Sequence, residues 1–126
     1  MIDALFNEPS YLAMKKTLDA VALRHEAIAS NIANLETPGY QRVDLAPSFQ
    51  SELERASTNG DPRQMAALKP TLTPDINAVP QGRDGNTVNL ENEFMQLTQN
   101  TLANAVETRL IAGRLARLKL AITGKI

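Results

Sequence analysis

The chain has 126 residues, enough for one domain, and 43% of them are apolar while only 4% are aromatic. Its 13 basic and 14 acidic residues give a net charge of −1, which argues against nucleic acid as a partner, because phosphate binding needs a clustered positive surface. The sequence contains no cysteine, which excludes disulfides and thiolate chemistry. No stretch approaches the ~20 apolar residues of a membrane-spanning helix, so we expect no membrane insertion. Asp3 stands where a cleaved secretory signal would carry Lys or Arg.

The first 36 residues divide into a tail, residues 1–10, and a helix, residues 11–36. Ser10 is the predicted N-cap of that helix. Apolar residues alternate three and four positions apart, the a/d pattern of a coiled coil. These positions are Tyr11, Met14, Leu18, Val21, His25, Ile28, Ile32 and Leu35. The helix is therefore expected to bury one long stripe against a partner helix.

His25 is the single histidine and lies on the apolar stripe. Without cysteine or a second histidine it cannot build a zinc site, and no nucleophile or phosphate-binding motif accompanies it. The simpler interpretation is an interface histidine with a satisfied hydrogen bond. The sharper one is a protonation switch in an assembly interface, because an unperturbed histidine titrates near pH ~6.5. No catalytic residue, cofactor or metal site is predicted.

Residues 37–88 carry little periodicity and hold six of the seven prolines. A short helix is possible over residues 46–55, with Pro47 in its first turn. Residues 71–73 and 75–79 can form short strands or loop, and residues 59–62 and 82–86 are turn signals. The length of this irregular segment favours a flexible excursion between two long helices.

The last segment, residues 89–126, is predicted to be a second long helix. Asn89 is the expected N-cap, Glu91 and Glu93 suit the first turn, and Gly124 suits the C-terminal stop. A stripe through Leu90, Leu97, Ile111, Leu115 and Leu118 becomes polar in its middle, at Thr101, Asn104 and Thr108. A neighbouring row, Leu102, Val106, Leu110 and Gly113, is more apolar there. The apolar surface therefore shifts around this helix, or the helix buries more than one face. The fold class is mainly α, with the terminal helices paired as a coiled-coil-like α-hairpin around an irregular, proline-rich middle.

The most specific motif spans residues 30–42. Pro38 pushes Thr37 out of helical geometry, and Pro38-Gly39 suits the centre of a type II turn. Asn31 and Asn34 can turn their amides onto backbone groups that the helix end leaves unpaired. Tyr40 can pack its ring on the helix and keep its hydroxyl in water. An ordinary helix stop explains Thr37 to Gly39 but leaves the asparagines and Tyr40 unexplained.

These residues resemble the N-terminal signature of the flagellar rod, hook and hook-associated family. The motif residues are Asn31, Asn34, Thr37, Pro38, Gly39 and Tyr40. The chain also looks like the FlgB group of proximal rod proteins. The features that carry this likeness are its short length, residues 23–25, 43–53 and 85–91, and the helix ending at residues 110–115. A FlgC-like rod protein is the nearest competitor. Residues 57–81 are not covered by the resemblance, and Asn89 stands where the group is expected to have Asp, an equally good N-cap.

The resemblance implies a non-enzymatic structural subunit of the basal-body rod in the periplasmic space, one that transmits torque. It implies export by the flagellar type III apparatus without a cleaved signal. The implied partners are FlgC, FlgF, the FliE adaptor, the FliF membrane ring and other copies of the chain. The residues expected at assembly interfaces are Leu18, Val21, Ile28, Ile32, Leu97, Ile111, Leu115 and Leu118. A cytosolic coiled-coil adaptor or export chaperone is the alternative from a different class.

Overall fold

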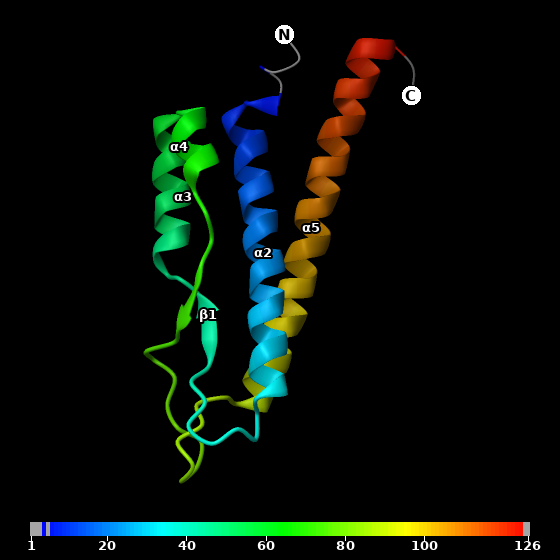
Figure 1. The fold of residues 1–126 in the computed structure, drawn as a ribbon. Helices are drawn as coiled ribbons and strands as arrows, with labels where there is room; N and C mark the ends of the chain where they lie inside the picture. The colour runs from blue at the N-terminus through cyan, green and yellow to red at the C-terminus, as the bar shows by residue number, and fades with distance from the viewer. Residues whose placement is uncertain (1–3, 5, 125–126) are drawn as a thin grey trace.

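Two long helices form the main axis of the molecule. The structure is a computed structural model that describes residue 4 and residues 6–124. Helix α2 (Pro9–Ala33) and helix α5 (Leu90–Thr123) lie side by side (Figure 1). They are antiparallel, because the partners on α2 run backwards as α5 proceeds: Asn100 Nδ2 donates to Val21 O (2.9 Å), and Arg114 Nη1, further along α5, donates to Ser10 Oγ (2.9 Å) near the start of α2. The predicted mainly α fold with paired terminal helices is confirmed.

The ends of α2 differ from the prediction. Pro9 occupies the first turn, where its missing N–H is not needed, and Glu8 is the N-cap. Ser10 does not cap the helix: its hydroxyl pairs with the Glu8 carboxylate at 2.9 Å, so that expectation was wrong. The helix ends at Ala33, and Asn34 N donates to Ser30 O (3.1 Å) and Asn31 O (3.2 Å) just beyond it.

The middle of the chain is more ordered than its composition indicated. Strand β1 (Val43–Leu45) pairs antiparallel with β2 (Leu72–Pro74), with Asp44 opposite Thr73. Between them lie helix α3 (Ser48–Asn59) and helix α4 (Pro62–Ala67). Helix α3 begins after Pro47 and extends past the expected residue 55 to a left-handed Gly60 (φ 65°). Helix α4 was not predicted.

The apolar core lies between α2 and this middle segment. Phe49, Leu53 and Ala56 of α3 and Met65 of α4 pack against Leu12 and Ala20 of α2. Burying each of the larger side chains stabilises the fold by roughly 1.5–3 kcal/mol. Residues 37–88 are thus not a detached excursion, since α3 and α4 supply four of the six buried residues of this cluster.

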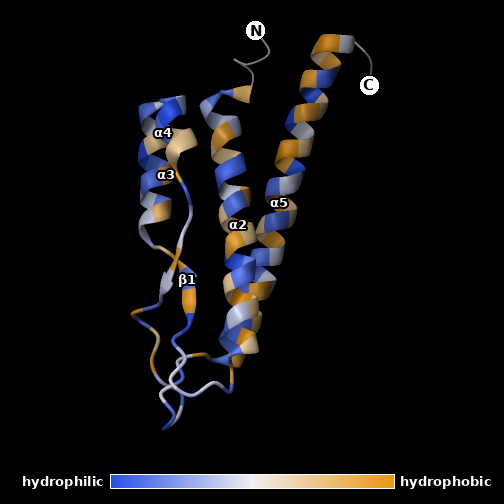
Figure 2. Cartoon of the chain, viewed as in Figure 1, coloured by the Kyte–Doolittle hydropathy of each residue, from blue (hydrophilic) through white to orange (hydrophobic). Residues whose placement is uncertain are grey.

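Helix α5 follows its sequence signals. The Asn89 side chain accepts a hydrogen bond from Asn92 N (3.0 Å), Glu91 and Glu93 lie in the first turn, and Gly124 adopts φ 64°. Apolar and polar residues alternate along its last turns, which rise beside the start of α2 with no helix on their far side (Figures 1 and 2).

Candidate functional site

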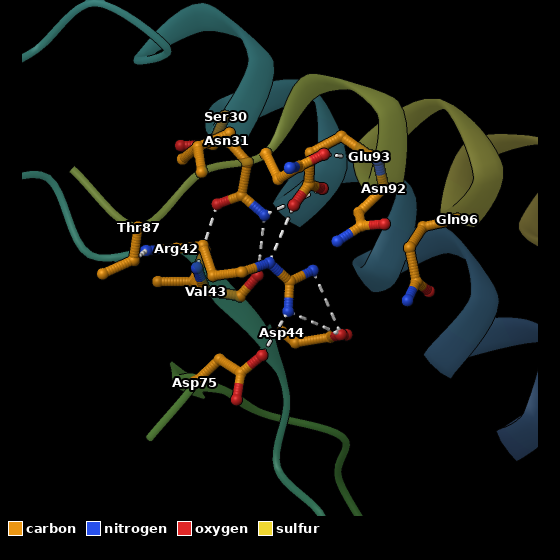
Figure 3. Close-up of polar contacts among 12 residues, drawn as sticks. Ser30, Asn31, Arg42, Val43, Asp44, Asp75, Thr87, Asn92, Glu93 and Gln96 are labelled. Atoms are coloured by element: carbon orange, nitrogen blue, oxygen red, sulfur yellow. Dashed lines mark hydrogen bonds and ion pairs between the residues drawn. The ribbon is translucent and has the colours of Figure 1, made fainter. Parts of the chain in front are cut away.

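The motif residues meet α5 and the middle segment at one end of the helix pair, which we call the motif junction (Asn31, Tyr40, Arg42, Asn86 and Glu93). Asn31 is fully buried. Its Nδ2 donates to Val43 O (2.9 Å) and Glu93 Oε2 (3.2 Å), and its Oδ1 accepts from Val43 N (2.9 Å) (Figure 3). The same Oδ1 also accepts from the Tyr40 hydroxyl (3.3 Å). The amide therefore pairs with β1 as a neighbouring strand would, and all its hydrogen-bonding capacity is used. The expectation that Asn31 bonds the helix end is replaced by this longer-range role.

A buried ion pair lies beside Asn31. Arg42 Nε donates to Glu93 Oε1 (2.7 Å), and Arg42 Nη1 donates to Asp75 Oδ2 (2.6 Å) and contacts Asp44 Oδ2 (3.4 Å) (Figure 3). The Glu93 side chain is 0% exposed, so its charge depends on this pairing. The acids come from β1, from the end of β2 and from the first turn of α5. Arg42 thus connects three segments that lie far apart in the sequence.

The pKa values of Arg42 and Asp75 are set by burial and by hydrogen bonding, which act in opposite directions. Burial acts to lower the pKa of Arg42, but hydrogen bonds to Glu93 and Asp75 outweigh it and raise that pKa above its ordinary value. Burial acts to raise the pKa of Asp75, but the hydrogen bond from Arg42 and the Asn77 backbone N–H hold it below its ordinary value. Both groups therefore stay charged at neutral pH.

Asn86 closes the junction from the other side. Its Nδ2 donates to three carbonyls just past α2, those of Asn34 (2.9 Å), Leu35 (3.0 Å) and Thr37 (2.8 Å). Asn34 O and Thr37 O also accept backbone N–H groups, from Thr37 (3.0 Å) and Tyr40 (3.2 Å), so Asn86 reinforces the turn that follows the helix. The sequence indicated only a turn at residues 82–86. The signal for a larger role was that Asn86 lies within residues 85–91, one of the stretches that resemble the FlgB group.

The remaining motif residues shape the chain reversal. Tyr40 N donates to Thr37 O (3.2 Å) and Gly39 has φ 72°, as a type II turn requires. Asn34 Nδ2 donates to the helix carbonyl of Ser30 (2.8 Å), which matches its expected role, and Thr37 Oγ1 donates to Asn34 Oδ1 (3.1 Å). Pro38 is exposed and lies at the outside of the turn.

The junction is suited to holding segments together, since its polar groups bond to one another. Across residue 4 and residues 6–124, no cluster of three or more His, Asp and Glu side chains is placed to hold a metal ion. In the same described part of the chain, none of the helices combines the length and apolar character needed to cross a membrane.

The expected interface residues fall into two classes. Val21 and Ile28 are buried within the chain, where α2 meets α5. The others are partly or substantially accessible: Leu18, Ile32, Leu97, Ile111 and Leu118 are half-buried, and Leu115 is exposed. His25 is exposed and lines a hollow with Ile28, Ile32 and Leu97. Their part in assembly, including the protonation switch at His25, stays a prediction.

The largest uncovered apolar surface lies on α5. Within this helix, all of which the structure describes, the buried residues are Glu93 and Asn100, both polar. Leu102 is 66% exposed and Ile122 is 73% exposed. Leu102, Val106, Leu110 and Leu120, which we call the exposed row, lie on one side of the helix and are all exposed. A helix with such a surface is suited to a partner.

Comparisons with known proteins agree with the motif. A profile of the family described as "Flagella basal body rod protein" matches residues 16–41. The flagellar basal body rod protein FlgB of Escherichia coli (strain K12) is 32% identical over 117 residues, covering 80% of this chain and 83% of the relative. FlgB of Cereibacter sphaeroides is 36% identical over 110 residues, covering 81% and 84%, and FlgB of Borrelia hermsii is 28% identical over 123 residues, covering 83% and 89%. The chain therefore belongs to the FlgB family of flagellar basal body rod proteins.

Proposed function

We propose that this chain is a non-enzymatic structural subunit of the proximal rod, which assembles through α2 and α5 and transmits torque. The observation that carries the proposal is the exposed row on α5. Of the 34 residues of α5, only Glu93 and Asn100 have buried side chains. Packing within its own chain therefore contributes little stability to the part of α5 beyond the junction. Burial of the exposed row against neighbouring subunits supplies the missing apolar contacts.

The proposed neighbours are other copies of the chain, FlgC, FlgF, the FliE adaptor and the FliF membrane ring. We further propose that the chain reaches the periplasmic rod through the flagellar type III export apparatus, without a cleaved signal. Few aromatic residues and no cysteine are compatible with passage as an unfolded chain and folding afterwards. Because the chain belongs to the FlgB family, we do not propose that it is a FlgC-like rod protein.

Purified hook–basal bodies test the function. The gene is deleted in the source strain, and the full-length chain is supplied in trans. We expect motility to return and mass spectrometry to detect the chain in the purified basal bodies. A chain that stays in the cytosol while intact basal bodies lack it would contradict the proposal and favour a cytosolic adaptor or export chaperone.

A matched pair of variants relates the function to α5. Leu110→Asp places a charge on the exposed row, and Glu91→Gln alters an exposed residue in the first turn of the same helix. We expect Leu110→Asp to lose motility and basal-body incorporation and Glu91→Gln to retain both, because an unpaired charge is costly in an apolar interface. Ile28→Asp is less informative, since Ile28 is 2% exposed and the substitution disturbs the fold of the subunit itself.

A further inference from the structure

A groove runs along α2 between α3 and α5, which flank α2 on its two sides (Figure 1). Its volume is about 580 Å³. Thr17, Ala20 and Val21 line its α2 side, while Phe49 lines it from α3 and Ala103 from α5. Arg24, the remaining α2 residue of the lining, is paired with Asp44 at 3.1 Å at the β1 end of the groove. Small residues on one helix between two flanking helices leave room for a further helix to approach closely.

The groove continues toward the free end of α5. A second hollow that shares Gln50 extends it along α3, past Leu53 and Glu54. On the other side, Val106 and Leu110 follow Ala103 by three and seven residues and so lie on the same face of α5. Both are exposed. The apolar surface therefore runs without a break from the groove into the exposed row.

Charge is distributed unevenly along α5. Residues 90–107 contain three acids, Glu91, Glu93 and Glu107, and no base. Residues 108–123, which we call the distal part of α5, contain four bases and no acid: Arg109, Arg114, Arg117 and Lys119. Both sides of the groove also carry an acid, since Glu54 lies on α3 and Glu107 lies one turn after Ala103. An apolar helix with basic flanks matches this groove in both character and charge.

The distal part of α5 cannot reach the groove of its own chain. Helix α5 is continuous over 34 residues, and its distal part is held beside the start of α2 by Arg114, which pairs with Glu8 and bonds to Ser10 Oγ (2.9 Å). The Arg114 guanidinium also lies 5.9 Å from the centre of the Tyr11 ring. Arg109 and Arg117 are exposed on the same segment and available to a neighbour.

We propose that the groove receives the distal part of α5 from a second copy of this chain, with the two α5 helices parallel and staggered. Pairing Arg117 of one copy with Glu107 of the next displaces the copies by ~10 residues, or roughly 15 Å at 1.5 Å per residue, and lays the distal part of α5 over the groove. Donor and acceptor are different surfaces, so the contact is heterologous and can repeat without closing. The parallel arrangement rests on the proposed function, because subunits of a rod share one direction along its axis.

Cross-linking of single-cysteine variants tests the docking, since the native chain has no cysteine. Gln50→Cys marks the groove and Leu120→Cys marks the distal part of α5; both positions are exposed. The purified full-length variants are mixed and treated with a short bismaleimide. We expect a Gln50→Cys/Leu120→Cys heterodimer, and none when Arg83→Cys, on the exposed loop at the opposite end of the molecule, replaces Gln50→Cys.

Other cross-linking results would overturn the docking. Leu120→Cys linked only to itself would indicate a closed antiparallel dimer. Absence of the heterodimer, whether or not the chain self-associates in analytical ultracentrifugation, would assign the groove to a different partner. Motility with each variant separates this outcome from the function: variants that restore motility but give no heterodimer leave the rod role intact and remove the docking.

A charge exchange tests the matching of acid and base. Arg117→Glu in the donor should weaken association with the native chain about two- to fivefold, the range of an exposed ion pair. Association between Arg117→Glu and Glu54→Arg chains should recover most of that loss. Equal weakening in the native and exchanged mixtures would contradict electrostatic matching between these two segments and with it the proposed register.

Discussion

The two ends of the α2–α5 pair partition polar and apolar residues in opposite ways. At the motif junction, the buried side chains are polar, with Asn31 and Glu93 both 0% exposed. Toward the other end, apolar residues of α5 face solvent, with Leu120 43% and Ile122 73% exposed. A buried polar residue and an uncovered apolar patch are the two observations that call for explanation in a folded chain. The first is explained within the subunit by hydrogen bonds, while the second calls for a partner outside it.

The contrast assigns different tasks to the two ends. The junction joins segments distant in sequence through directional bonds, which specify one arrangement of α2, β1 and α5. The free end of α5 has an apolar surface, whose contacts are not directional and which can be buried when the chain associates with a partner. The following substitutions should therefore damage folding at one end and association at the other.

Glu93→Gln should have the largest effect on stability. It leaves Arg42 in a buried site without the carboxylate at 2.7 Å, and removing one member of a buried ion pair costs about 3–5 kcal/mol. Arg42 keeps its bond to Asp75 (2.6 Å), so we expect a loss near the lower end of that range. Urea denaturation followed by circular dichroism measures the free energy of unfolding. Glu91→Gln, on the exposed side of the same turn, is the control and should change it by less than about 0.5 kcal/mol. Equal effects of the two variants would show that the buried ion pair does not stabilise the junction.

Asn86→Ala should have the second largest effect. Val88 N, which is buried, loses its acceptor Asn86 Oδ1 (2.8 Å), and Leu35 O loses its donor (3.0 Å); leaving a buried polar group unpaired costs roughly 1–3 kcal/mol. We expect lower stability in the same denaturation experiment and faster amide exchange at Gly39 and Thr87, whose N–H groups bond across this loop. Asn77→Ala, at an exposed position in the preceding loop, is the matched control. Unchanged exchange at Gly39 would contradict the role of Asn86 in holding the two loops together.

Sequence reasoning found the helices because their signals are local. Asn89, Glu91 and Gly124 act within a turn of their own positions, so capping rules predicted both ends of α5. The helical content of residues 48–67 was underestimated because α3 and α4 are short and are stabilised by packing on α2 rather than by a long periodic pattern.

The junction was only partly predictable for the same reason. The turn at Gly39 and the bond from Asn34 to Ser30 O are local and were expected. The partners of Asn31 and Arg42 are 62 and 51 residues away at Glu93, and no spacing rule relates such positions. An acid in the first turn of a helix is favoured by the helix dipole, so the sequence already explained Glu93 locally. Its buried role was therefore not predicted.

The pH dependence of stability provides a finer test of the junction. The pKa of Asp75 is lower in the folded chain than in the unfolded one, so its pairing with Arg42 stabilises the fold above the unfolded value of about 3.9 and is lost as pH falls through the lower, folded value. The free energy of unfolding of the native chain should exceed that of Asp75→Asn near neutral pH, and the difference should shrink below about pH 4. A difference that stays constant between pH 7 and pH 3 would mean that the Asp75 charge contributes nothing to the junction.

Leu102→Ser should have the smallest effect on folding, and it completes the contrast between the two ends. Since Leu102 is already 66% exposed, the free energy of unfolding of the monomer should change by less than about 0.5 kcal/mol. Association should weaken clearly in sedimentation velocity, because the proposed assembly buries this leucine between copies. Phe49→Ala provides the opposite control: Phe49 is 5% exposed, and its loss should destabilise the monomer by about 3–5 kcal/mol. If Leu102→Ser destabilised the monomer as strongly as Phe49→Ala, the exposed row would already be covered within the subunit and the distinction between a folding end and an assembly end would fail.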